Sequence, residues 1–235
     1  MRIFLDTAET SVIREYYATG LVDGVTTNPT LIMKSGRDPE DVYSELADIG
    51  LQDISMEVVG TGDEMLSEGR RLAQKFGDVA TIKVPCTRGG LAACKLLSEE
   101  GIKVNVTLIF NAAQAILSAK AGATYVSPFI GRLDDNSVAG LEVIRSIAEV
   151  YKVQGVKKTQ ILAASIRDVY KVSRAFWNGA NIVTMPPKIF EGMYKHVLTD
   201  KGLEIFDRDY QETKKSVFNP PPFATTKHGK DLDTL

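Results

Sequence analysis

Residues 80–85, Ala80-Thr81-Ile82-Lys83-Val84-Pro85, form a short apolar and β-branched run that contains one cation and is followed by a turn signal. The run predicts a buried strand, where lysine is costly because its charge loses water unless a partner compensates it. Chemistry can use this penalty, since a lysine that gives up its proton becomes an amine able to attack a carbonyl. The alternative is a strand-end lysine whose head reaches water. Other residues of the sequence are needed to choose between these two interpretations of Lys83.

Similar runs recur along the chain and alternate with segments of helical periodicity. The predicted strands are Arg2–Leu5, Asp23–Thr26, Ile54–Val59, Ala80–Val84, Lys103–Leu108, Thr124–Phe129, Gln160–Ala164 and Asn181–Met185. The predicted helices are Ser11–Ala18, Pro39–Ile49, Asp63–Phe76, Gly89–Glu99, Ala112–Ala121, Val138–Tyr151, Asp168–Asn178 and Lys188–His196. Because the strands are too continuously apolar for a sheet with one wet face, we expect a parallel sheet covered by helices. This number of units favours a closed (β/α)8 TIM barrel over a doubly wound open sheet.

The predicted fold is therefore an α/β barrel with an additional C-terminal helix and an extended tail. We interpret residues 1–215 as one catalytic domain, in which Gly202–Lys215 forms the helix after the barrel. Residues 216–235 contain Pro220, Pro221 and Pro222 and are predicted to be the extended tail.

Composition excludes several classes of function. The chain has 235 residues, of which 28 are basic and 30 acidic, so its net charge of -2 favours neither nucleic acid nor a membrane surface as a partner. The N-terminal apolar run is too short for a signal peptide and no later run approaches the span of a bilayer, so we expect a cytoplasmic protein. Two cysteines and two histidines supply neither a disulfide framework nor spaced metal ligands. We therefore predict no metal and no cofactor.

Polar residues gather where the predicted strands end, which is where barrel enzymes carry their catalytic groups. Asp6 closes the first strand, Asn28 follows the second, and Glu57 and Lys83 lie in the third and fourth. Each has a simple structural alternative when it is considered alone. Asp6 and Glu9 have the spacing of a capping box, and the Asn-Pro pair after the second strand is an ordinary turn signal.

The later strands add amide, hydroxyl and aromatic side chains to the same end. Asn105 and Thr107 point to one face because side chains alternate along a strand, and Ser127 and Phe129 do the same in the next strand. Guanidinium groups and a hydroxyl that are placed to surround a phosphate follow, at Arg132, Ser165 and Arg167. Each arginine alone is more often a solvated surface residue. It is the combination at one end of a barrel that indicates a site.

These residues, in this order, resemble the transaldolase family, specifically its small single-domain branch that also contains fructose 6-phosphate aldolase. The resemblance runs from Arg2 to about Tyr210. Its carriers are Phe4-Leu5-Asp6-Thr7-Ala8, Gly24-Val25-Thr26-Thr27-Asn28-Pro29-Thr30, Ile82-Lys83-Val84-Pro85, Asn105-Val106-Thr107-Leu108-Ile109-Phe110, Ser127-Pro128-Phe129-Ile130-Gly131-Arg132 and Ala163-Ala164-Ser165-Ile166-Arg167. The resemblance implies a (β/α)8 barrel, a Schiff-base lysine at Lys83, and a homo-oligomer built as a pentamer or decamer.

The resemblance also assigns roles by position. Asp6 matches the general acid/base of the family. Glu57 and Thr107 match the pair that holds the catalytic water, and Asn28 and Asn105 match the amides that hold hydroxyls of the donor sugar.

The remaining matches concern the substrate. Ser127 matches a contact to a substrate hydroxyl, and the phosphate of the acceptor is bound in the family at the positions of Arg132, Ser165 and Arg167. The aldolase branch resembles this chain closely but carries glutamine at the position of Glu57 and tyrosine at that of Phe129. Both positions therefore favour transaldolase.

The resemblance implies transfer of a dihydroxyacetone unit in the non-oxidative pentose phosphate pathway. The donor would be sedoheptulose 7-phosphate or fructose 6-phosphate, and the acceptor glyceraldehyde 3-phosphate or erythrose 4-phosphate. Two alternatives stay open: a fructose 6-phosphate aldolase, and a non-catalytic barrel that binds sugar phosphates.

Overall fold

Parallel strands close a barrel in the computed structural model, which describes residues 1–218. The strands are β1 (Arg2–Asp6), β2 (Gly24–Thr26), β3 (Ile54–Glu57), β4 (Ala80–Pro85), β5 (Lys103–Ile109), β6 (Tyr125–Pro128), β7 (Gln160–Ala163) and β8 (Ile182–Met185). Strand β1 pairs in parallel with both β2 and β8, so the sheet has no open edge. The predicted (β/α)8 barrel is confirmed, and the doubly wound open sheet is wrong.

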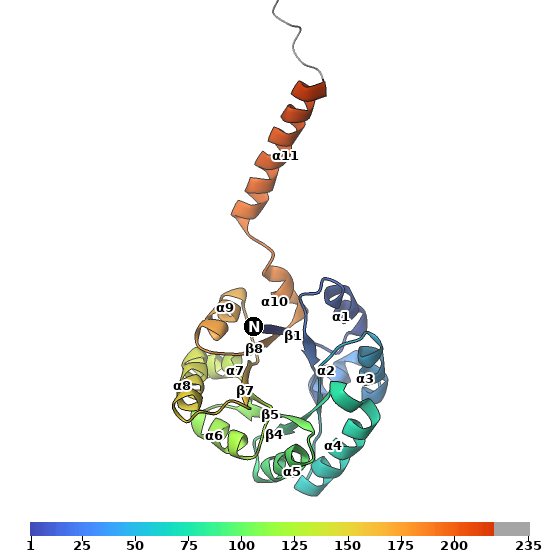
Figure 1. Ribbon diagram of the computed structural model, residues 1–235, viewed down its shortest axis with the longest axis vertical. Helices are drawn as coiled ribbons and strands as arrows, with labels where there is room; N and C mark the ends of the chain where they lie inside the picture. Colours follow the sequence, from blue (N-terminus) through green and yellow to red (C-terminus); the bar gives the residue numbers. More distant parts are fainter. Residues whose placement is uncertain (219–235) are drawn as a thin grey trace, which may run out of the picture. The chain divides into compact units, whose positions relative to one another are not determined.

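Helices surround the barrel, as the view along it shows (Figure 1). They are α1 (Thr10–Tyr17), α2 (Pro29–Ser35), α3 (Pro39–Asp48), α4 (Gly62–Phe76), the 3-10 turn η1 (Gly77–Val79), α5 (Arg88–Glu99), α6 (Ala112–Lys120), α7 (Ile130–Asp135), α8 (Gly140–Val153), α9 (Val169–Trp177) and α10 (Pro187–Gly192). Every strand and helix that the sequence predicted for the barrel overlaps an observed one.

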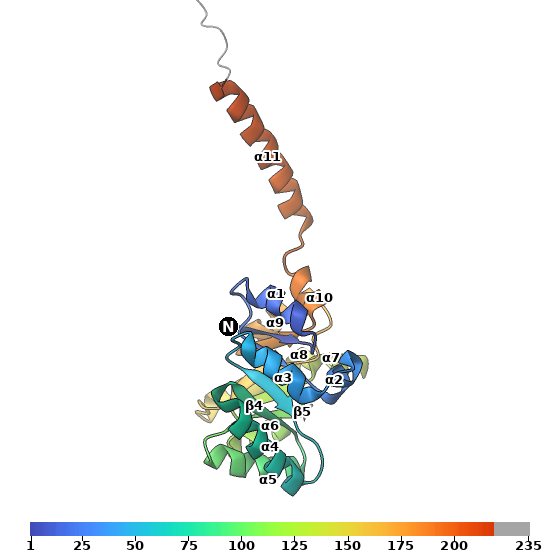
Figure 2. The ribbon, with the colours of Figure 1, turned by 90° about the vertical axis from the view of Figure 1, so that its right-hand side faces the viewer.

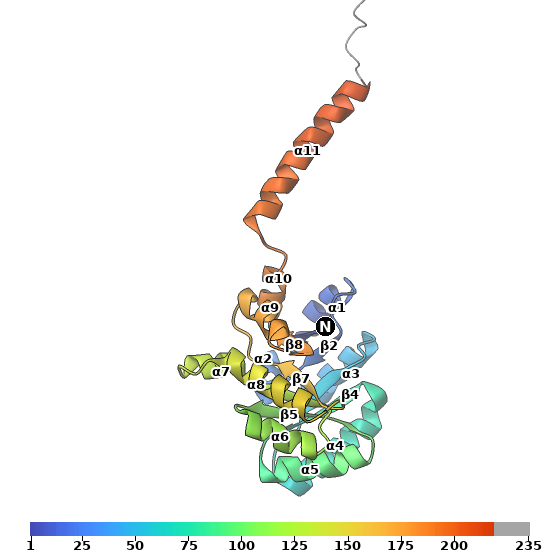
Figure 3. The ribbon, with the colours of Figure 1, turned by 60° about the vertical axis from the view of Figure 1, so that its left-hand side comes forward.

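Two short helices were not predicted, and both lie at the end of the barrel where the strands finish (Figures 2 and 3). Helix α2 follows β2 at once: Asn28 caps it, and Pro29 occupies its first turn, where a missing backbone N–H costs nothing. The Asn-Pro pair is therefore a helix start and not only a turn. Helix α7 follows β6 and has no side-chain cap, so the sequence carried no start signal for it.

The strands are buried on both sides because alternate residues face the helices and the barrel interior. Leu5, Val25, Ile54 and Ile82 belong to the large apolar cluster between strands and helices. The alternate positions inside the barrel hold a smaller apolar cluster, Phe4, Tyr125, Leu162, Ala164 and Ile182. The rest of the interior is polar, which is unusual for a core and marks the part of the barrel that carries the candidate site.

Strand register sets which polar residues become neighbours. Asp6 pairs with Thr26 between β1 and β2, and Glu57 pairs with Lys83 between β3 and β4. Lys83 in turn pairs with Asn105 on β5. Three adjacent strands thus present a carboxylate, an amine and an amide at one level of the barrel.

The chain after the barrel forms a second unit, Met193–Leu235, separate from Met1–Gly192. It contains α11 (Val197–Phe218), within which the predicted helix Gly202–Lys215 lies. The predicted tail begins at Ser216. Residues 216–218 are still part of helix α11, and residues 219–235 lie outside the described part of the chain. The domain division at residue 215 stays a prediction. Within residues 1–218, each helix is too short or too polar to cross a lipid bilayer.

Candidate active site

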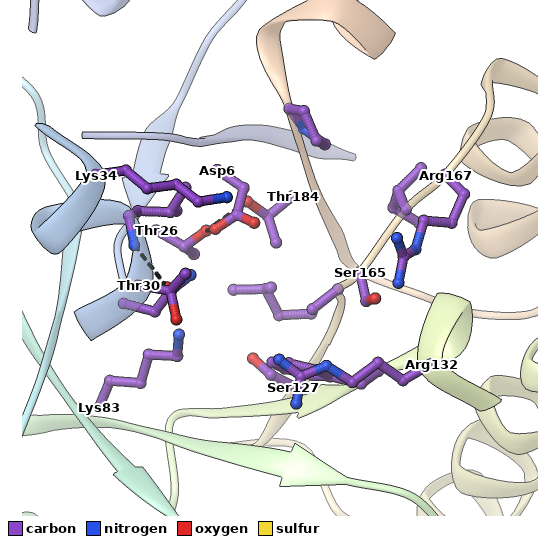
Figure 4. A pocket seen from close by; sticks show the side chains of 17 residues that line it. Asp6, Thr26, Thr30, Lys34, Lys83, Ser127, Arg132, Ser165, Arg167 and Thr184 are labelled. Atoms are coloured by element: carbon purple, nitrogen blue, oxygen red, sulfur yellow. Dashed lines mark hydrogen bonds between the residues drawn. The ribbon is translucent and has the colours of Figure 1, made fainter. Parts of the chain in front are cut away.

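A cavity of about 310 Å³ lies at the C-terminal ends of the strands (Figure 4). Most of the residues predicted for the site line it, namely Asp6, Asn28, Lys83, Ser127, Phe129, Arg132, Ser165 and Arg167. The other three, Glu57, Asn105 and Thr107, are not part of its lining. Figure 4 shows the amine of Lys83 on one side of the space and Ser165, Arg132 and Arg167 on the opposite side.

Lys83 is held in the wall of this cavity with its amine paired. The residue is 3% exposed, and Nζ lies 2.9 Å from Oε2 of Glu57. Nζ also donates a hydrogen bond to the backbone carbonyl of Thr27 at 2.9 Å. The alternative of a strand-end lysine whose head reaches water is therefore wrong. The expectation that the amine is uncharged stays a prediction, and the adjacent carboxylate provides the place to which its proton can go.

Asp6 contributes a buried carboxyl at the end of β1. The hydroxyl of Thr26 donates to its Oδ1 at 2.8 Å. Burial raises the pKa of Asp6 above the ordinary value, while the Lys83 cation and the hydrogen bond from Thr26 act in the opposite direction. Asp6 does not cap the next helix, since α1 begins at Thr10 after Glu9, so the capping alternative is wrong. A carboxyl with a raised pKa that faces a cavity is suited to proton transfer.

Two amides are positioned by different means. Asn28 lines the cavity, and its Oδ1 accepts from the backbone N–H of Leu31 at 3.0 Å. This cap fixes the side chain, so the amide nitrogen is the group that can face a ligand. Asn105 is fully buried: its Nδ2 donates to Ser55 Oγ at 3.2 Å, and Ser127 Oγ donates to its Oδ1 at 2.7 Å. Ser127 thereby links the cavity surface to Asn105 beneath it.

Thr107 was predicted to work with Glu57. It lies on β5 opposite Pro85 and is 1% exposed. Its Oγ1 is buried without a hydrogen-bond partner among residues 1–218, so no hydrogen bond joins it to Glu57 in the described chain. A buried hydroxyl in this condition is rare and keeps its full capacity to bind another polar group.

The cationic side of the cavity comes from α7 and the loop after β7. The guanidinium of Arg132 lies 4.8 Å above the ring of Phe129, and Arg167 forms an ion pair of 2.7 Å with Asp135. Ser165 has a φ of 59°, in the left-handed region. Its carbonyl lies so close to Gly131 that a Cβ there would come within 2.0 Å of it. Helix α7 can therefore approach the Ser165 loop only because residue 131 has no side chain.

The sequence interpretation missed several lining residues. Thr30 and Lys34 lie four residues apart on α2, a helix that was not predicted, and both line the cavity. Thr184 lies inside β8, where the sequence did offer a signal, because it is the polar residue in an otherwise apolar strand.

A family model described as Transaldolase/Fructose-6-phosphate aldolase matches residues 3–234. The chain belongs to this family. A probable transaldolase of Caulobacter vibrioides is 51% identical over 218 residues, covering 92% of this chain and 100% of the relative. A probable transaldolase of Paracoccus denitrificans is 52% identical with the same coverage.

Family membership confirms the resemblance found in the sequence, and the match continues past Tyr210, where that resemblance ended. A thiamine phosphate pyrophosphorylase structure from Pyrococcus furiosus aligns with a TM-score of 0.52 at 14% identity, over 78% of this chain and 85% of that chain. At this identity the likeness shows the fold alone. Among the described residues, no cluster of three or more His, Cys, Asp or Glu could hold a metal ion.

Proposed function

We propose that this protein is a transaldolase that transfers a dihydroxyacetone unit between sugar phosphates through a Schiff base on Lys83. The enzyme class agrees with the family and with the name of relatives at about half identity. The observation that carries the proposed mechanism is a buried lysine, at the surface of a cavity, whose Nζ lies 2.9 Å from a carboxylate. The donors would be fructose 6-phosphate or sedoheptulose 7-phosphate.

In the first step, Nζ of Lys83 attacks the C2 carbonyl of the donor. The proton that the amine must lose passes to Glu57, which is the nearest carboxylate. The same group returns a proton to the carbinolamine hydroxyl, which leaves as water and gives the iminium. Thr107 supports this water step with its unpartnered hydroxyl.

In the second step, the iminium draws in the electron pair of the C3–C4 bond as that bond breaks. Asp6 takes the proton of the C4 hydroxyl, so the departing fragment becomes an aldehyde and an enamine remains on Lys83. A second aldehyde phosphate then reacts with the enamine by the reverse steps. The kinetics are therefore ping-pong.

The positive charges of two arginines orient the substrate in the cavity. Arg132 and Arg167 present guanidinium groups opposite Lys83, with the hydroxyl of Ser165 between them (Figure 4). Guanidinium forks suit phosphate oxygens, so the phosphate end lies here while C2 lies at Lys83. Asn28 and Ser127 then face the hydroxyls between these two ends.

Phe129 favours transfer over release of free dihydroxyacetone. Its ring meets Phe110 edge-on with centroids 6.1 Å apart and lies beneath Arg132. A phenyl ring has no hydroxyl that could deliver water to the enamine or iminium, so the intermediate persists until an acceptor arrives. Phe129 and Glu57 both favour transaldolase, so fructose 6-phosphate aldolase is the second candidate function.

Borohydride trapping tests the proposal. Incubation with fructose 6-phosphate and borohydride should reduce the iminium to a stable secondary amine, which peptide mass spectrometry should locate on Lys83. Lys83→Met should abolish the adduct and the transfer activity. Lys103→Met, which removes a strand lysine at the other end of the barrel, should retain both. An active parent enzyme that leaves no adduct on Lys83 would contradict the mechanism. A non-catalytic binding barrel predicts neither an adduct nor transfer activity.

The predicted pentamer or decamer and the predicted cytoplasmic location stay predictions. Light scattering coupled to size-exclusion chromatography measures the first directly.

A further inference from the structure

Two buried hydroxyls form a row that leads from β8 to the carboxyl of Asp6. Thr184 Oγ1 lies 2.7 Å from Thr26 Oγ1, and Thr26 Oγ1 lies 2.8 Å from Asp6 Oδ1. Both threonines are 2% exposed, and all three residues line the cavity (Figure 4). Asp6 lies on β1 and Thr26 on β2, which pair with each other. Thr184 lies on β8, the other strand that pairs with β1.

The direction of these hydrogen bonds follows from counting protons. A hydroxyl carries one proton, and an ionised carboxylate only accepts. When Asp6 is ionised, the proton of Thr26 goes to Oδ1, so Thr26 Oγ1 must accept from Thr184. When Asp6 is protonated, its O–H can donate to Thr26, which can then donate to Thr184. The hydrogen bonds that join the three side chains are thus kept in both states without movement of a heavy atom.

We propose that Thr184 is a positioning residue that acts through Thr26 to hold Asp6 and to let its hydrogen bonds reverse when Asp6 gains a proton. The inference rests on the proposed function, in which Asp6 accepts the C4 hydroxyl proton. Thr184 itself need not touch the reacting atoms. Its donated bond orients the Thr26 hydroxyl and strengthens the bond that Thr26 gives to the carboxylate, because linked hydrogen bonds polarise one another.

Other charged groups act on Asp6 from several elements. Lys83 on β4 and Arg132 on α7 favour the ionised form, whereas Glu57 on β3 and burial disfavour it. A change at Thr184 leaves all of these groups in place. Its effect on Asp6 is therefore transmitted through Thr26, and a method that reports the ionisation of Asp6 can isolate it.

The test is the pH profile of the cleavage half-reaction in Thr184→Val and Thr184→Ser. Valine keeps the shape and removes the donor, so the acidic limb of kcat should move to higher pH by roughly half a unit. Serine restores the donor and should restore the parent profile. Thr81→Val is the matched control: Thr81 is another buried strand threonine, whose hydroxyl bonds to Asp53 at 2.9 Å. Its acidic limb should not move.

Thr184→Ala provides a second donor-free variant if valine impairs folding, and circular dichroism establishes the fold of each. An acidic limb that stays in place in both donor-free variants would overturn the inference, and so would an equal shift in the serine variant. Borohydride trapping is performed in parallel. An adduct on Lys83 with an unmoved limb refutes the role of Thr184 alone, whereas loss of the adduct from the parent refutes the proposed function.

Discussion

Oε2 of Glu57 lies 2.9 Å from Nζ of Lys83, in a pair whose side chains are 13% and 4% exposed. Two charges taken out of water are tolerated only when they compensate one another, and the loss of one partner leaves the other unpaired. The β3–β4 register brings the two residues side by side, so this relationship is set by the strands themselves. It supplies both a reason for the buried lysine and a route for its proton.

Replacing Glu57 should therefore slow formation of the imine. Glu57→Ala removes the proton acceptor, and we expect the rate of adduct formation to fall about 100-fold or more. Glu57→Gln should be milder, because the amide oxygen still accepts from Nζ and the aldolase branch carries glutamine there. Rapid mixing with fructose 6-phosphate, followed by borohydride quenching at set times, measures the rate. An alanine variant that forms the adduct as fast as the parent would show that Glu57 is only a structural counter-ion.

Phe129 should control the fate of the intermediate. Phe129→Tyr places a hydroxyl beside the cavity, and we expect aldol cleavage to rise relative to transfer because water can be delivered to the covalent intermediate. Assays with and without erythrose 4-phosphate give the ratio of the two activities. Phe110→Tyr is the matched control, since Phe110 contacts Phe129 but is not part of the cavity lining. An unchanged ratio in Phe129→Tyr would count against this role.

The barrel was predictable because its strands are short, largely apolar and separated by amphipathic helices. The strand Ala80–Val84, for example, differs from β4 by one residue at its end. Helix α2 was not predicted because it is short and its start, Asn28-Pro29, also fits a turn. Short helices bury little surface, so their pattern of apolar residues is weak.

The candidate site was predictable in its members more than in their contacts. Asp6 and Lys83 stood out because charged residues in apolar strands need an explanation. The hydrogen bond between Asn105 and Ser55 could not be predicted, because it depends on the strand register of the complete barrel. Thr184 is recognisable as the polar residue of an apolar strand, but its contact with Thr26 could not be predicted, because Thr26 belongs to a strand at the other end of the sequence.

The buried carboxyl of Asp6 should lower the stability of the folded protein while it serves catalysis. Burial raises the pKa of Asp6 from its ordinary value of 3.8, so the folded protein disfavours the ionised form. The cost to stability is present at neutral pH and vanishes as pH falls below 3.8, where the carboxyl is protonated in both the folded and unfolded states. Asp6→Asn should therefore raise Tm at pH 7 while it abolishes transfer. Thermal unfolding from pH 8 to pH 4 should show the gain shrinking as pH falls. A gain that is absent at pH 7, or that grows toward low pH, would contradict this assignment.

Arg132 and Arg167 should determine preference for phosphorylated sugars. Removing either guanidinium by Arg132→Ala or Arg167→Ala should raise KM for fructose 6-phosphate about 10- to 100-fold, as expected for the loss of a charge-assisted bond. The kcat/KM for unphosphorylated fructose should hardly change. Arg174→Ala, on α9 and stacked over Trp177, provides a control arginine outside the cavity. Equal losses with both sugars would place the phosphate elsewhere.

Asp53 should stabilise the end of the barrel opposite the cavity. Its carboxylate accepts from Tyr125 Oη at 2.6 Å and Thr81 Oγ1 at 2.9 Å, and it lies 3.5 Å from Nζ of Lys103. Burial, reinforced by Asp53, raises the pKa of Tyr125 to about 12, so the phenol keeps the proton that it donates. Asp53→Ala leaves these donors unpaired, and we expect a loss of roughly 3 kcal/mol.

For a chain of this size, such a loss lowers Tm by about 6 to 12 °C. The kcat of the folded variant at 25 °C should stay close to that of the parent, because catalytic groups in barrels act at the C-terminal ends of strands and Asp53 precedes β3. Calorimetry and the transfer assay on the same sample separate the two effects. Asp53→Asn keeps an oxygen that can accept from Thr81 and should lose less stability than alanine. A Tm unchanged in Asp53→Ala would show that these bonds contribute no net stability.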